Sequence, residues 1–146
     1  MVRATIGGVE LLGSDLDRIR PTNLRVPVVE FAALWVFAER HCEAHPQDWY
    51  AAGVVMTCRW LANAVVRPPW GRWYVAFAPV TERSASAYEE LIAAELQAAE
   101  VLDMRRPVPA WLAARPGWLP AVLATLKWAW ARSGVPPLTV PRQAAG

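Results

Sequence analysis

A chain of 146 residues, of which 55% are hydrophobic and 19% charged, has enough apolar side chains for one hydrophobic core. This composition excludes an intrinsically disordered chain, and a formal net charge of +2 is too small to indicate a dedicated nucleic-acid binder by itself. We therefore expect a single domain over residues 1–146, with 1–25 as an N-terminal arm and 138–146 as a flexible tail.

Nine tryptophans are the most unusual feature of the composition. A tryptophan side chain buries a large apolar area but keeps one N–H group that needs a hydrogen-bond partner. Such a density predicts a core that contains several indoles and a surface that keeps others for contacts with a partner. Five of the nine lie within residues 26–77, the most apolar part of the chain, and they are Trp35, Trp49, Trp60, Trp70 and Trp73.

The first half of the chain predicts two consecutive apolar helices. Residues 27–45 contain few polar side chains, which is typical of a helix that is buried on most sides. Pro46 ends this helix and starts a second one, in which Asp48 lies near the positive end of the helix dipole and the apolar run continues to Val66. Because the break is so short, we expect the two helices to form a central hairpin.

Two short segments on either side of this hairpin have strand-like composition. Residues 5–12 combine apolar residues with nearby glycines, and residues 70–80 are rich in aromatic and β-branched side chains between prolines. The second segment is either a strand or an extended connector packed on the helices. Its composition favours the strand, so we expect a short β-hairpin formed by residues 5–12 and 72–78.

Three further helices are predicted in the second half of the chain. Ser86 and Glu89 match a capping box that opens a helix running to about Asp103. A short helical piece follows at 110–115, and a last helix spans about 119–133 before Gly134. The fold class we expect is therefore mainly α, a compact bundle of about four to five helices around the central apolar hairpin.

Three charged residues occupy positions where apolar side chains are expected. Glu30 and Arg59 lie within the apolar hairpin, and Glu95 lies at the centre of the apolar face of the 86–103 helix. An isolated buried charge is very unfavourable, so we expect Arg59 to pair with Glu30, and Glu95 to add a second carboxylate. These residues are also the candidates for an acid/base site, but a structural network is the favoured interpretation because no nucleophile or metal motif accompanies them.

His41 and His45 are four residues apart, a spacing that places two imidazoles on one face of a helix. They are therefore candidate metal ligands. Pro46 ends the helix directly after them, and histidines in a last helical turn are also explained by the negative end of the helix dipole. The dipole explanation is favoured, and we expect neither a metal ion nor another cofactor.

The stretch from Arg59 to Tyr74 alternates cations with aromatic rings, a combination found in proteins that bind single-stranded nucleic acid. The same combination is also found in an ordinary surface loop with cation–π contacts. Within this stretch we expect the aromatic and basic side chains at its end to lie at the surface and to contact a partner. These candidates are Trp70, Arg72, Trp73 and Tyr74.

The last helix carries a second candidate contact. Its apolar residues form one face, which leaves Trp128 and Arg132 on the opposite side. Trp128 is expected either to contact a partner or to lie under a second packing layer formed by the N-terminal arm or by the segment around Trp111. The sequence does not separate these two alternatives. In the interaction protein that we expect, Trp128 lies at the surface and contacts the partner together with Arg132.

The expected function follows from these surfaces. Residues 49–66 are long enough to raise the question of a membrane span, but Arg59 and Asn63 speak against it, and two cysteines without an export leader indicate a cytoplasmic protein. We expect a non-catalytic interaction protein or accessory subunit, which binds a protein partner or forms a homo-oligomer. One alternative is a nucleic-acid-associated or regulatory protein that uses residues 59–74. Another is a small enzyme or ligand pocket built on Glu30, Arg59 and Glu95.

Overall fold

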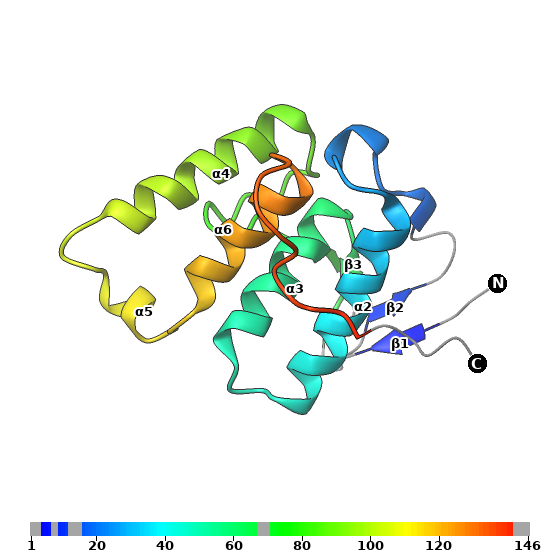
Figure 1. Ribbon diagram of the computed structural model, residues 1–146, viewed down its shortest axis with the longest axis horizontal. Helices are drawn as coiled ribbons and strands as arrows, with labels where there is room; N and C mark the ends of the chain where they lie inside the picture. The colour runs from blue at the N-terminus through cyan, green and yellow to red at the C-terminus, as the bar shows by residue number, and fades with distance from the viewer. Residues whose placement is uncertain (1–3, 7–8, 12–15, 67–70, 142–146) are drawn as a thin grey trace.

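The computed structural model describes residues 4–6, 9–11, 16–66 and 71–141 (Figure 1). The prediction of a compact, mainly α fold is confirmed, because helices dominate this part of the chain. The helices are α2 (Val28–Ala44), α3 (Trp49–Leu61), α4 (Glu89–Met104), α5 (Ala110–Ala113) and α6 (Trp118–Ala129), and a single 3-10 turn, η1, covers Pro21–Asn23.

The strands pair locally, and the predicted pairing of residues 5–12 with 72–78 is wrong. Two separate antiparallel pairs occur in the described part of the chain, and each joins strands that are neighbours in the sequence. Local pairing closes a shorter loop and therefore loses less chain entropy than a pairing across the two central helices. The pairs are β1 (Ala4–Ile6) with β2 (Val9–Leu11), and β3 (Val65–Val66) with β4 (Tyr74–Val75).

The connection between α2 and α3 forms where the sequence predicts it. The α2 helix ends at Ala44, and Asp48 is the N-cap of α3, where its side chain accepts a hydrogen bond of 3.1 Å from the backbone N–H of Ala51. The other carboxylate oxygen of Asp48 lies 3.0 Å from Nε2 of His41. One carboxylate thus satisfies a free donor at the start of α3 and also holds the end of α2 against it.

The α6 helix packs against both α3 and α4. Its approach to α3 is closest at Gly53, where an added Cβ atom would lie 2.6 Å from the carbonyl oxygen of Trp118 and 2.8 Å from Cβ of Ala121. The absence of a side chain at Gly53 therefore sets the distance between these two helices. The largest fully buried side chains include three indoles, those of Trp35, Trp60 and Trp118.

A buried asparagine joins three segments of the fold. The Nδ2 group of Asn23, in η1, donates to the carbonyl oxygens of Leu61 at 3.2 Å and Ala87 at 3.0 Å. Asn63 completes the junction, because its Oδ1 accepts a hydrogen bond of 2.8 Å from the N–H of Ala87. These bonds fasten the segment before α4 to the end of α3.

The start of α4 differs from its prediction. The N-cap residue of α4 is Tyr88, and no side chain caps the helix, so the predicted capping box at Ser86 does not form. Glu89 and Glu90 in the first turn still place negative charge at the positive end of the dipole. The part of the chain that the structure describes contains no helix long and apolar enough to cross a bilayer.

Candidate functional site

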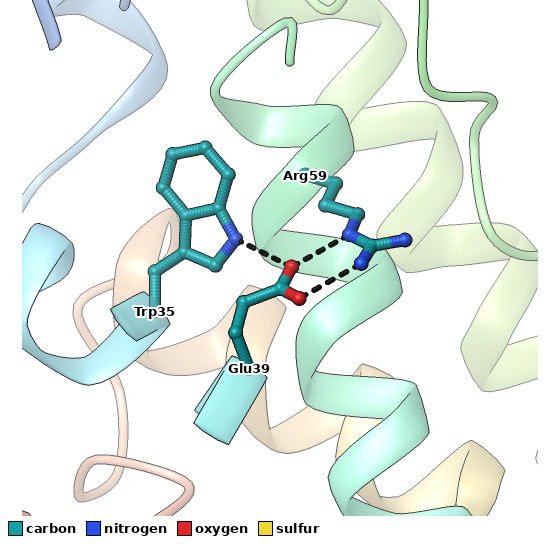
Figure 2. A network of polar contacts seen from close by, with 3 residues as sticks. All are labelled: Trp35, Glu39 and Arg59. Atoms are coloured by element: carbon teal, nitrogen blue, oxygen red, sulfur yellow. Dashed lines mark hydrogen bonds and ion pairs between the residues drawn. The ribbon is translucent and has the colours of Figure 1, made fainter. Parts of the chain in front are cut away.

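Arg59 is bound to Glu39 at the contact between α2 and α3 (Figure 2). The Nε and Nη2 atoms of Arg59 donate to the two oxygens of the Glu39 carboxylate at 2.6 and 2.8 Å, and the indole N–H of Trp35 donates to one of these oxygens at 3.2 Å. Glu39 is buried, whereas Arg59 is partly exposed. The arrangement fixes one edge of the guanidinium, while its remaining nitrogen points away from Glu39 (Figure 2).

The predicted pair between Arg59 and Glu30 is therefore wrong, although Arg59 does pair with a carboxylate of α2. An α-helix turns by about 100° per residue, so Glu30 and Glu39, nine positions apart, project to opposite sides of α2. Glu39 lies beside the buried residues Trp35 and Ala38, and Glu30 is exposed. The spacing of the apolar residues in α2 contained this signal, since it places Glu39 next to the buried face.

Glu95 does not join Arg59 either. Its carboxylate is buried and accepts hydrogen bonds from the backbone N–H groups of Val80 and Thr81, and from the Thr81 hydroxyl at 2.7 Å. Glu95 therefore holds the segment before α4 in place. The three charges predicted to form one network lie at three separate positions.

A second arginine is held by aromatic rings. The guanidinium carbon of Arg115, in the turn between α5 and α6, lies 5.3 Å from the ring centroid of Trp49, 5.6 Å from that of Trp111 and 5.7 Å from that of Trp118. Cation–π attraction to three rings restrains this side chain without neutralising its charge. Tryptophans from three elements thus position one cation.

Arg59 and Arg115 open into the same cleft. The cleft has a volume of about 390 Å³ and lies between α3 and the segment that contains β4. We call it the arginine cleft. The residues lining it are Met56, Arg59, Val66, Tyr74, Ala76, Phe77, Ala78, Pro79, Glu82 and Arg115.

Large apolar side chains are exposed on the segment that contributes Tyr74 and Phe77 to this cleft. Trp73, Tyr74, Val75 and Phe77 are 60%, 43%, 38% and 48% exposed, and we call these four residues the aromatic patch. The rings of Tyr74 and Phe77 stack with their centroids 5.5 Å apart. Short β-pairing of Tyr74 with Val66 and of Val75 with Val65 supports the backbone beneath the patch. Arg72, beside the patch, is also exposed.

Trp128 is buried, so the expectation that it lies at the surface is wrong. It is only 6% exposed, and its ring lies nearly parallel to that of Phe31, with a centroid distance of 6.4 Å. The α6 helix is covered on several sides, and both α2 and residues 135–140 lie against Trp128. Arg132 is exposed, and its role in binding stays a prediction. Trp70 lies outside the described residues.

The two histidines lie together, with ring centroids 4.5 Å apart, and Nε2 of His41 contacts Asp48. Among the residues that the structure describes, no group of three or more His, Cys, Asp or Glu side chains is arranged to hold a metal ion. His41 instead contributes to the connection between α2 and α3.

Neither cysteine is an activated thiol. Both are free, and burial, followed by the negative charge of nearby Glu39, raises the pKa of Cys58 well above its ordinary range. Burial, and then Glu39, also raises the pKa of Cys42. A thiol nucleophile needs a lowered pKa, so this part of the fold lacks the setting for one.

The comparisons with known proteins add no family to these observations. No family model matches this chain, and no curated protein or solved structure shows significant similarity to it.

Proposed function

We propose that this protein is a non-catalytic interaction module, which binds another protein through the aromatic patch and the arginine cleft. The observation that carries the proposal is the exposure of four consecutive or nearly consecutive large apolar side chains, Trp73, Tyr74, Val75 and Phe77, beside two restrained arginines. Exposed aromatic rings and arginines are the residues that most often dominate the binding energy of protein interfaces.

The restraint of these side chains supports the proposal. Arg59 is fixed by Glu39, Arg115 is held by three indoles, and Tyr74 is stacked on Phe77. A side chain that is already ordered loses less conformational entropy when a partner binds, so more of its contact energy contributes to affinity.

The charge at this surface indicates which side chains the partner presents. Arg115 lines the cleft, where three indoles restrain it without neutralising its charge, and Arg72 lies beside the patch. The charge of Arg59 is paired with Glu39, and Glu82 is the acidic residue that lines the cleft. A second copy of the chain, docked symmetrically by the same surface, would bring these arginines towards one another. We therefore infer a different protein, one that presents apolar side chains together with carboxylates.

The nucleic-acid alternative is less well supported. The indole of Trp60 is buried and its N–H donates to the carbonyl oxygen of Ala85 at 3.4 Å, so it is not available to stack on a base. Arg59 is engaged by a buried carboxylate. The exposed part of the 59–74 stretch that the structure describes is then centred on Arg72, Trp73 and Tyr74, a small footprint for a phosphate backbone.

The catalytic alternative is also less well supported, because its three candidate residues lie apart. An acid/base site built on Glu30, Arg59 and Glu95 requires these groups to face a common space. Glu30 is exposed on α2, Arg59 is bound to Glu39, and Glu95 holds Val80 and Thr81. Their separation supports a structural role for Arg59 and Glu95.

Site-specific photo-crosslinking tests the proposal. We would place p-benzoylphenylalanine at position 77 in the patch, or at position 101 as a control, because Val101 is a similarly exposed apolar residue on α4. We expect one protein to crosslink from position 77 in cells, and this product to disappear when Trp73 is changed to Glu. Equal products from both positions would contradict the proposal.

Light scattering on the purified chain tests whether a second copy of the chain, and not a different protein, binds the patch. A mass that is a multiple of 16.2 kDa, and that returns to 16.2 kDa in a Trp73→Glu variant, would assign the patch to a second copy of the chain. We expect both the wild type and the Trp73→Glu variant to be monomers.

A further inference from the structure

A second and larger cavity lies on the opposite flank of α2 from Arg59. It has a volume of about 820 Å³, within the range of small-molecule sites, and its lining residues come from α2, the end of α6 and the segment 135–140 that follows α6. The residues that line it are Glu30, Ala33, Leu34, Trp128, Val135, Pro136, Leu138, Thr139 and Val140. We call it the C-terminal cavity.

The walls of this cavity are anchored to the rest of the fold. The hydroxyl of Tyr50, in α3, donates to the carbonyl oxygen of Pro137 at 2.8 Å, and Leu138 packs on the hydrophobic core. On the other side, Trp128 is stacked on Phe31 of α2. Both walls are therefore held in place by contacts that do not depend on an occupant of the cavity.

The chemistry of the lining is strongly asymmetric. The side chains are apolar except for the Thr139 hydroxyl and the Glu30 carboxylate, so Glu30 is the one ionisable group among the lining residues. Glu30, Ala33 and Leu34 follow the i, i+3, i+4 spacing and therefore lie on one face of α2. Because Glu30 is exposed, its charge remains hydrated at the mouth of the cavity.

We propose that the C-terminal cavity binds a small organic ammonium ion with an apolar body. The apolar part contacts Leu34, Trp128 and Leu138, and the cationic group lies beside the carboxylate of Glu30. An anionic ligand of the same shape is repelled by Glu30, and a neutral one gains only the apolar contacts. This site shares no lining residue with the arginine cleft, so the inference is independent of the proposed function.

The test compares three probes with the same eight-carbon chain, namely octyltrimethylammonium, octanol and octanoate. Isothermal titration calorimetry is performed below the concentration at which the probes form micelles. We expect saturable binding of octyltrimethylammonium at one site per chain, weaker binding of octanol, and octanoate weakest of all. Absence of saturable binding of the cation, or octanoate binding as tightly as the cation, overturns the proposal.

Two variants locate the binding. Glu30→Gln is expected to weaken octyltrimethylammonium about fivefold, as for loss of one charge contact in a partly solvated setting, and to leave octanol unchanged. Glu43→Gln is the matched control, because Glu43 is exposed on the same helix and does not line the cavity. Equal affinities of the Glu30→Gln and Glu43→Gln variants for the cation contradict the role of Glu30.

Filling the cavity provides a second, charge-independent test. Ala33→Phe places a ring at the mouth, where Ala33 is exposed, so the fold is retained and circular dichroism checks this. We expect this variant to lose affinity for both octyltrimethylammonium and octanol. Unchanged affinity for both probes shows that they bind elsewhere and overturns the proposal.

Discussion

Arg59 and Glu39 join α2 to α3 through two hydrogen bonds, with the guanidinium Nε 2.6 Å and Nη2 2.8 Å from separate carboxylate oxygens. Such two-point geometry is more specific than a single contact and suits arginine better than lysine. The pair also determines which side of Arg59 faces the cleft, so it connects the packing of the central helices with the proposed binding surface.

Removing the Glu39 carboxylate while Arg59 is kept should destabilise the protein strongly. Glu39→Ala leaves the Arg59 guanidinium and the Trp35 N–H without their acceptor, and we expect a loss of about 3 kcal/mol in the free energy of unfolding. Replacing both residues with methionine removes both charges together and should recover most of that loss. Urea unfolding measures both values, and a double variant no more stable than Glu39→Ala would contradict this explanation.

The close approach of α3 and α6 predicts a second effect. In Gly53→Ala the new methyl group meets the Trp118 carbonyl oxygen and Cβ of Ala121, neither of which moves independently of its helix. We expect a loss of about 1–3 kcal/mol, despite the better helix propensity of alanine.

Ala93→Gly is the control for that propensity, since Ala93 is exposed within α4 and the change reports the intrinsic preference without packing. Thermal or urea unfolding gives both values. A Gly53→Ala variant more stable than the wild type would show that the two helices separate without loss.

Asp48 predicts a pH dependence of stability. The hydrogen bond from the Ala51 N–H, and then the contact with His41, hold the pKa of Asp48 below its ordinary value of 3.8. A lowered folded-state pKa means that the carboxylate stabilises the fold fully above about pH 4, and that this contribution is lost as the pH falls through the lower value.

The matched variants separate the charge of Asp48 from its capping role. Asp48→Ala should reduce the free energy of unfolding by about 1 kcal/mol at pH 7, and the difference from the wild type should shrink as the pH falls below about 4. Asp48→Asn keeps a capping side chain that does not titrate. Its free energy of unfolding should therefore exceed that of Asp48→Ala both at pH 7 and below about pH 4. A difference between wild type and Asp48→Ala that grows in acid would contradict the assignment.

The cysteines predict a simple reactivity pattern. Cys58 is fully buried and burial raises its thiol pKa, whereas Cys42 is partly exposed. Labelling with a thiol reagent at pH 8 should modify Cys42 slowly in the native protein, because burial and Glu39 raise its pKa, and Cys58 only after unfolding in urea. A Cys42→Ser variant identifies which thiol reacts, and rapid labelling of that variant in its native state would contradict the buried position of Cys58.

The helices of this fold could be predicted because they depend on local sequence. Pro46 and Asp48 mark the break between α2 and α3, and Gly53 and its apolar neighbours continue α3 beyond it. The strands could not be predicted in the same way, because each contains only two or three residues and its partner depends on the path of the chain.

Residue partners were harder to predict than elements. The charge of Arg59 predicts a carboxylate partner on α2, and the spacing of the apolar residues in that helix places Glu39, not Glu30, next to the buried face. The prediction of an exposed Trp128 assumes that α6 packs on one side, whereas α2 and residues 135–140 cover a second side. The error at Trp128 therefore comes from tertiary packing that periodicity within a single helix does not contain.

The central claim is that the aromatic patch binds a protein, and the affinity for the crosslinked partner tests it most directly. We would measure the dissociation constant of this partner for the wild type, for the Trp73→Ala/Phe77→Ala double variant and for Val101→Ala. The account predicts at least about a tenfold loss of affinity in the double variant, as for interface residues that each contribute about 1 kcal/mol or more, with Val101→Ala close to wild type. Equal affinities for all three proteins would contradict it.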